Sequence, residues 1–235
     1  TIYSPGEILR VPKDCTWQGV PTKVAGFDIS HTLGGDKSVL MIGSIGVCTD
    51  GKKRLRFENV HYLNEDVTRK DVDRTTQMVT QLKQICDKEG VDVGRFLRVD
   101  FGGKASERPV SSADRVKSST RYANRVSELW GVGKELIRCD QIRNIPKGMA
   151  EDMTSRKYKE SKADDGGSKI RVETKREMKQ RINRSPDEGD AGFILIDLCR
   201  DRHGLSGIDK PGGQKPGVKS PLKRRFDALA SLFAA

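Results

Sequence analysis

The chain has 235 residues, which suits one well-buried domain with appendages or two small domains. It carries 44 Lys and Arg against 33 Asp and Glu, a formal net charge of +11, and this excess favours a polyanionic partner such as nucleic acid. No apolar run approaches the roughly 20 residues of a membrane span, and the N-terminus lacks a signal-peptide plan, so we expect a soluble, intracellular protein. The cysteines lie far apart without zinc-site spacing, so we expect reduced thiols.

The first part of the chain predicts an arm followed by three antiparallel strands. Residues 1–21 are rich in proline and lack periodicity, so we expect an arm or linker. Apolar runs at residues 24–29 and 38–48 and an alternating segment at 54–63 predict the strands. The Asp-Gly pair at residues 50–51 predicts the tight turn between the second and third strands.

The middle of the chain predicts two helices and a fourth strand. Apolar residues at helical spacing over 67–88 predict a helix that stops at Gly90. Residues 96–100 are β-prone and predict a strand that ends on Asp100, and residues 119–137 predict the second helix.

The last part predicts a strand, two helices and a tail. Residues 169–174 alternate as a strand, and residues 175–182 form a charged helix. Ser185 is expected to cap the next helix, with Pro186 in its first turn. Residues 204–235 are expected to be a flexible basic tail with a short terminal helix, which leaves residues 22–203 as the main domain. This order of elements fits an α/β fold of the ribonuclease-H-like, RuvC type, with a mixed central sheet flanked by helices.

Four carboxylates stand where such a sheet can gather them. Asp28 lies in an apolar strand, where a buried acid is costly unless it is paired or bound to metal. Asp100 ends the predicted fourth strand, and Asp187 and Asp190 lie one turn apart at the start of the last helix. Each also has a simple structural explanation, as a hydrogen-bonded strand acid, a loop start or a helix-start residue. Together they are typical of a site for two Mg²⁺ or Mn²⁺ ions, about 4 Å apart, that hydrolyses phosphodiesters.

Several segments resemble one known family, the nuclease domain of phage large terminases. The matching segments, in chain order, are Gly26–Ser30 with Gly35–Val39, Tyr122–Trp130, Ile170–Lys175 and Arg184–Ala191. The resemblance covers roughly residues 22–200, and the closing segment is its most specific part.

The resemblance implies a two-metal endonuclease that cuts concatemeric double-stranded viral DNA during genome packaging. Carried over by position, it implies that Asp28 and Asp100 are metal ligands and that the Asp187 and Asp190 pair supplies the third acidic position. Asp190 is expected to be the closer ligand, because RuvC-type resolvases of the same fold use acids one turn apart there. Lys175 is expected either near the scissile phosphate or as a solvated lysine at a helix start.

The sequence departs from the family pattern around Asp100. Phe101 to Ala105 follow that residue directly, whereas the family places a helix and a strand between its acid-ended strand and this segment. Asp92 is therefore a weaker alternative for the second acid. His31 is expected to be a hairpin residue rather than a ligand.

The sequence contains no GxxxxGK[ST] phosphate loop, so we expect no ATP hydrolysis by this chain. It begins at Thr1 rather than Met, and the resemblance implies an upstream ATPase domain of the same polypeptide. The implied partners are double-stranded DNA, the portal ring and the small terminase subunit. The implied location is the host cytoplasm, with transient attachment at the portal vertex of the capsid.

DNA contact is expected from basic side chains near the carboxylates, mostly to phosphates. The proposed residues are Lys104, Arg108, Arg121, Lys175 and Arg184. Two alternatives remain open. A Holliday-junction-type resolvase on the same fold predicts a stable dimer and a preference for branched DNA, and a non-catalytic DNA-gripping or portal-docking module predicts binding without cleavage.

Overall fold

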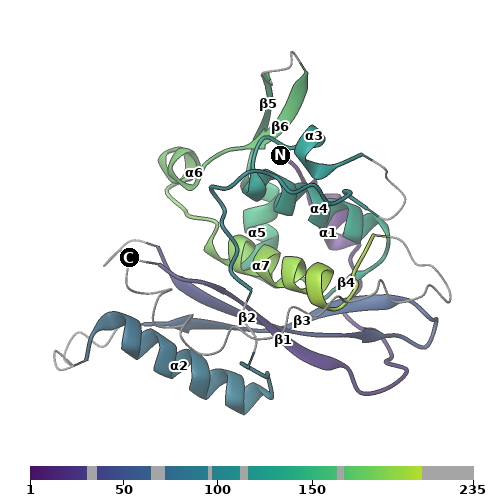
Figure 1. Ribbon diagram of the computed structural model, residues 1–235, viewed down its shortest axis with the longest axis vertical. Helices are drawn as coiled ribbons and strands as arrows, with labels where there is room; N and C mark the ends of the chain where they lie inside the picture. Colours follow the sequence, from purple (N-terminus) through teal and green to yellow (C-terminus); the bar gives the residue numbers. More distant parts are fainter. Residues whose placement is uncertain (31–35, 65–71, 95–96, 112–115, 163–166, 208–235) are drawn as a thin grey trace.

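The computed structural model describes residues 1–30, 36–64, 72–94, 97–111, 116–162 and 167–207. Over these residues the protein is a mixed α/β structure, with a four-stranded mixed sheet flanked by helices (Figure 1). The predicted terminal helix and most of the basic tail, together with His31, lie outside the described residues.

The sheet has the order β1-β2-β3-β4. Its strands are β1 (Thr22–Asp28), β2 (Ser38–Val47), β3 (Lys53–Leu63) and β4 (Ile142–Arg143). The first three strands are antiparallel, as predicted, and the short β4 runs parallel to β3. The predicted turn at Asp50-Gly51 is confirmed, with Gly51 in the left-handed region at φ 82°, where glycine carries no steric cost.

The predicted fourth strand at residues 96–100 is wrong. Residues 97–100 have no ladder partner among the described residues, and β4 takes the edge position beside β3. Val99 and Phe101 instead pack against the main hydrophobic core. The β-prone pattern therefore reflects side-chain burial rather than strand pairing.

Helices cover both faces of the sheet (Figure 1). One face carries α7 (Asp187–Arg202), with α4 (Arg125–Arg138) and α5 (Lys147–Ser155) packed beyond it, and the other face carries α2 (Arg74–Glu89). The smaller elements are α1 (Pro5–Leu9), α3 (Ser118–Arg121), α6 (Lys175–Ile182) and a hairpin of β5 (Tyr158–Lys162) and β6 (Ser168–Val172). None of the helices in the described part of the chain combines the length and hydrophobicity that a membrane span requires.

Two predicted helices differ in detail from the structure. The helix expected over residues 119–137 is divided into α3 and α4, because Ala123 N donates to the Ile170 carbonyl (3.0 Å) and Asn124 starts a new helix by accepting a hydrogen bond from Ser127 N. The helix expected over residues 67–88 is present as α2, which begins at Arg74, and residues 67–71 lie outside the described residues. Gly90 ends the helix with φ 75°, as predicted.

Gly26 allows α7 to lie directly on β1. A Cβ atom at this position would be 2.5 Å from the Ala191 carbonyl oxygen and 2.6 Å from Leu195 N, closer than any side chain tolerates. Because side chains alternate along a strand, Asp28 shares the face of Gly26. The contact therefore brings the end of β1 against the first turn of α7.

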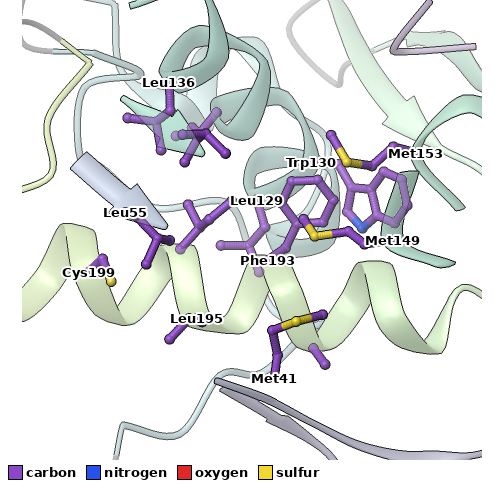
Figure 2. Packing of buried hydrophobic residues seen from close by; sticks show 14 of the residues in the cluster. Met41, Leu55, Leu129, Trp130, Leu136, Met149, Met153, Phe193, Leu195 and Cys199 are labelled. Carbon is purple, nitrogen blue, oxygen red and sulfur yellow. The ribbon is translucent and has the colours of Figure 1, made fainter. Parts of the chain in front are cut away.

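The main hydrophobic core lies between the sheet and α7, α4 and α5. Figure 2 shows Trp130 and Phe193 side by side within it, with ring centroids 4.6 Å apart. Residues 1–21, expected as an arm or linker, contribute Ile2, Tyr3 and Ile8 to this core. All five cysteines are free thiols, as predicted.

Candidate functional site

Asp28 is the last residue of β1, and its side chain is buried against the start of α7. Its Oδ2 atom lies 2.7 Å from Lys175 Nζ. Burial raises the pKa of Asp28, the nearby Asp190 carboxylate also raises it, and the Lys175 ammonium opposes both effects, which leaves the pKa at about 7. Asp28 is therefore a buried acid paired with a lysine.

Asp187 and Asp190 lie in the first turn of α7, where helix dipoles favour negative charge. Asp187 Oδ2 accepts a hydrogen bond from Lys37 N (2.9 Å), which ties the start of β2 to this turn. Ser185 was expected to cap the helix, but its hydroxyl donates to Asp187 Oδ1 (2.7 Å) and Pro186 occupies the cap position. Asp190 is buried, with 1% of its surface exposed.

Lys175 joins the three carboxylates. Its ammonium lies 2.7 Å from Asp28, 3.3 Å from Asp190 Oδ2 and 3.5 Å from Asp187 Oδ1. A capping box formed by Thr174 and Glu177 starts α6 at this residue, so the backbone of Lys175 is fixed. Although burial alone would lower the pKa of Lys175, the Asp190 and Asp28 carboxylates raise it, so the side chain carries a positive charge. We call Asp28, Asp187, Asp190 and Lys175 the carboxylate cluster.

Two further residues hold Asp190 from the side opposite Lys175. Arg156 NH1 and Trp130 Nε1 both donate hydrogen bonds to Asp190 Oδ1, at 2.9 Å and 3.0 Å. Among the described residues no group donates a hydrogen bond to Asp190 Oδ2, which faces the Lys175 ammonium. Sequence analysis missed this role of both residues, because Trp130 fits the apolar face of its helix and Arg156 belongs to no recognisable pattern.

Asp152 is a buried acid of α5 that sequence analysis also missed. Its Oδ2 accepts a hydrogen bond from Gly189 N (2.9 Å), and Arg184 NH2 lies 2.9 Å from its Oδ1. Burial raises the pKa of Asp152, and the Gly189 N–H and the Arg184 guanidinium offset this only in part, which leaves the pKa at about 7. The hydrogen bond from Gly189 N therefore joins α5 to the first turn of α7, which carries Asp187 and Asp190.

The structure does not bring Asp100 to the carboxylate cluster. Asp100 is exposed, and its Oδ1 accepts a hydrogen bond from Gly102 N (3.0 Å) in a local turn. Asp92, the alternative second acid, is also exposed and makes the same kind of turn with Gly94 N (2.8 Å). The charges that act on Asp28 come instead from Asp190, Lys175 and Asp187.

The basic residues expected to contact DNA fall into two groups. Arg108 is bound to Asp197 (2.7 Å) and Arg184 to Glu151 and Asp152, so carboxylates of the chain engage both guanidinium groups. Lys104 and Arg121 are exposed. Beside Lys175 lies a shallow, open pocket of about 390 Å³, lined by Asp36, Lys175, Arg176, Lys179 and Gln180.

The donor chemistry of the carboxylate cluster fits a hard divalent cation. Carboxylate oxygens are the ligands that Mg²⁺ and Mn²⁺ prefer, and the buried Asp190 Oδ2 accepts no hydrogen bond from the part of the chain that the structure describes. Within the residues that the structure describes, no group of three or more His, Cys, Asp or Glu side chains is arranged to hold a metal ion. In this structure the three carboxylates surround the Lys175 ammonium, so a positively charged group already binds between them.

Comparison of the chain with protein-family models and with curated protein sequences gives no match.

Proposed function

We propose that this chain is a metal-dependent endonuclease that cuts double-stranded DNA by phosphodiester hydrolysis. The observation that carries the proposal is the convergence of Asp28, Asp187 and Asp190 on a single cation, Lys175 Nζ. These acids come from the first strand and the last described helix, and a buried group of this kind is unfavourable unless a cation binds it. The net charge of +11 supports a polyanionic substrate.

The fold supports the same proposal. Three antiparallel strands, a parallel fourth strand and helices on both faces are compatible with a ribonuclease-H-like fold of the RuvC type. We propose this fold, and with it the resemblance to the nuclease domain of phage large terminases. On this proposal the chain acts on concatemeric viral DNA in the host cytoplasm and at the portal vertex, with an ATPase domain, the portal ring and the small terminase subunit as partners.

The carboxylate cluster would hold Mg²⁺ or Mn²⁺, with Asp28 and Asp190 as the principal ligands and Asp187 beside them. When bound, a pair of such ions activates a water molecule and stabilises the leaving oxygen of the phosphodiester. Lys175 neutralises part of the acidic charge in the absence of metal. Once a metal ion takes over the carboxylates, the Lys175 ammonium would be released to bind a phosphate oxygen of the substrate.

The DNA backbone is proposed to follow the pocket along α6. Lys175, Arg176 and Lys179 line this pocket, and Lys175 belongs to the carboxylate cluster. Arg108 and Arg184 are less suited to this task than the sequence suggests, because binding a phosphate would take each from a buried carboxylate. Lys104 and Arg121 stay as proposed contacts at the exposed surface.

Cleavage of supercoiled plasmid tests the proposal. The protein is incubated with plasmid and Mg²⁺, Mn²⁺ or EDTA, and nicked and linear products are measured for the wild type, Asp28→Asn and Asp190→Asn. We expect metal-dependent cutting by the wild type and its loss in both variants, because each substitution removes a charged oxygen ligand.

Asp201→Asn is the matched control, since Asp201 is a partly exposed acid at the far end of α7. It should cut like the wild type. A folded wild-type protein that binds DNA without cutting it under any metal condition would favour the DNA-gripping or portal-docking module instead. Preference for a four-way junction over linear duplex, together with a stable dimer, would favour the resolvase.

A further inference from the structure

The two carboxylate oxygens of Asp190 have different surroundings. Oδ1 accepts hydrogen bonds from Arg156 and Trp130, whereas Oδ2 lies 3.3 Å from Lys175 Nζ and receives no hydrogen bond from the described residues. Rotation about the Cα–Cβ bond (χ1) carries the whole carboxylate of an aspartate from one staggered position to another. Two donors on one oxygen oppose that rotation, since turning the group would leave both donors unpaired in a buried place.

Arg156 is itself held rigidly. Its side chain is buried, with 1% of the residue surface exposed, although it lies just after α5 at the start of a connecting segment. Nε donates to the Glu173 carbonyl (3.0 Å), and NH1 donates to Asp190 Oδ1 (2.9 Å). The planar guanidinium therefore spans from the backbone just before α6 to the first turn of α7.

Trp130 completes the arrangement from α4. Its ring lies under the Arg156 guanidinium, with Cζ 4.5 Å from the ring centroid, and its Nε1–H donates to the same Asp190 oxygen. Phe193 packs against Trp130 in the core (Figure 2). Packing in the core therefore fixes the orientation of the indole independently of its hydrogen bond to Asp190.

We infer that Arg156 and Trp130 are positioning residues that hold Asp190 in one side-chain rotamer, with Oδ2 directed at the cation position of the carboxylate cluster. They act through Asp190 and do not touch a substrate phosphate. The consequence for catalysis rests on the proposed function: partners of this kind fix the orientation of metal-binding side chains, and their loss typically weakens metal binding by 10–100-fold.

The side-chain rotamer of Asp190 can be measured without any metal. Three-bond couplings across χ1 of Asp190 are recorded by NMR for the metal-free wild type, Trp130→Phe, Arg156→Lys and Leu136→Val. Trp130→Phe keeps an aromatic ring under the guanidinium but removes the N–H donor. Arg156→Lys keeps the positive charge, but a lysine cannot bind the Glu173 carbonyl and Asp190 Oδ1 with a planar guanidinium. Leu136→Val is the control, because Leu136 is buried in the same helix and its loss of one methylene weakens the core without touching Asp190.

We expect couplings of a single rotamer in the wild type and Leu136→Val, and averaged couplings in Trp130→Phe and Arg156→Lys. Single-rotamer couplings in both test variants, or averaged couplings in Leu136→Val at a similar melting temperature, would overturn the inference. The second substitution keeps the test decisive if one of the two variants does not fold.

A Mg²⁺ titration then separates this inference from the proposed function. The chain has two tryptophans, so the indole N–H signal of Trp17 serves as an internal reference for that of Trp130. We expect Mg²⁺ to shift the Trp130 signal alone, and the same signal should show that Mg²⁺ binds Arg156→Lys about tenfold or more weakly than the wild type. A wild type that gives the expected couplings but no Mg²⁺ response would overturn the proposed function and leave the positioning role of Arg156 and Trp130 standing.

Discussion

A Cβ atom on Gly26 would lie 2.5 Å from the carbonyl oxygen of Ala191, so β1 and α7 meet backbone to backbone at this point. This contact determines how far Asp28 lies from Asp187 and Asp190. The distance between strand and helix is consequently part of the geometry of the carboxylate cluster.

Gly26→Ala should therefore impair the site as well as the fold. The added methyl group pushes α7 away from β1, and overpacking of this kind costs about 1–3 kcal/mol of unfolding free energy. We expect the cleavage rate to fall further than the loss of unfolding free energy alone would explain, because the substitution separates Asp28 from Asp187 and Asp190. Urea unfolding and plasmid cleavage measure the two effects, and Gly19→Ala is the control because its Cβ would meet nothing within 4 Å. Equal cleavage by Gly26→Ala and the wild type would contradict the expected coupling.

Lys175→Met should destabilise the metal-free protein. The substitution keeps the length of the side chain but leaves three buried acids without their shared cation, at a cost of about 2 kcal/mol after allowance for the partial exposure of Lys175. Millimolar Mg²⁺ should raise the melting temperature of this variant more than that of the wild type, because a bound cation replaces the lost charge.

Lys179→Met is the matched control for this experiment. Lys179 pairs with Asp36 (2.9 Å) at the exposed side of α6, so its loss should cost about 0.5 kcal/mol or less. Similar melting temperatures of Lys175→Met and the wild type in EDTA would show that the ammonium does not stabilise the carboxylates.

Asp100→Asn and Asp92→Asn should leave cleavage nearly unchanged. Both acids are exposed, and each accepts a hydrogen bond from the backbone of its own turn, so we expect rates within about twofold of the wild type and unfolding free energies within about 0.5 kcal/mol. Plasmid cleavage and thermal melts check both variants. If Asp100→Asn melted like the wild type but cut on the order of 100-fold more slowly, Asp100 would have to reach the site when DNA binds, as the terminase resemblance implies.

Asp152 should make the stability of the protein depend on pH. The pKa of this carboxyl is raised from 3.8 to about 7, so the folded state binds its proton more tightly than the unfolded state. The contribution of Asp152 to stability is therefore fully present below pH 3.8 and is lost as the pH rises through 7. Relative to Asp152→Asn, the wild type should lose about 2 kcal/mol between pH 5 and pH 8. Urea unfolding of both proteins at these two pH values measures the difference, and parallel stability profiles would contradict it.

The sequence predicted the first three strands because their patterns have local causes. Apolar runs, alternation and the Asp50-Gly51 turn act over a few residues and leave a readable signal. Asp28 was predictable for a related reason, since an acid in an apolar strand needs a partner. The partner itself, Lys175, lies 147 residues away. The sequence left open whether Lys175 lies near the scissile phosphate or is a solvated lysine at a helix start.

The remaining features depend on contacts that no local pattern encodes. β4 has two residues and exists because Leu55 and Arg56 pair with it. The β-prone run before Asp100 is apolar because Val99 packs on the core, so its pattern imitates a strand. Arg156 is a single charged residue among many, and only the assembled fold shows that it is buried against Asp190.

The separation of Asp28 and Lys175 along the chain has a consequence in time. At the usual 5–20 residues per second, a ribosome needs roughly 7–30 seconds to synthesise the 147 residues between them. Asp187 and Asp190 emerge later still, and α7 must then dock on the first strand before the acids meet. A nascent chain therefore has no assembled carboxylate cluster, and whatever chemistry the cluster performs begins only once synthesis has passed α7 and that helix has docked.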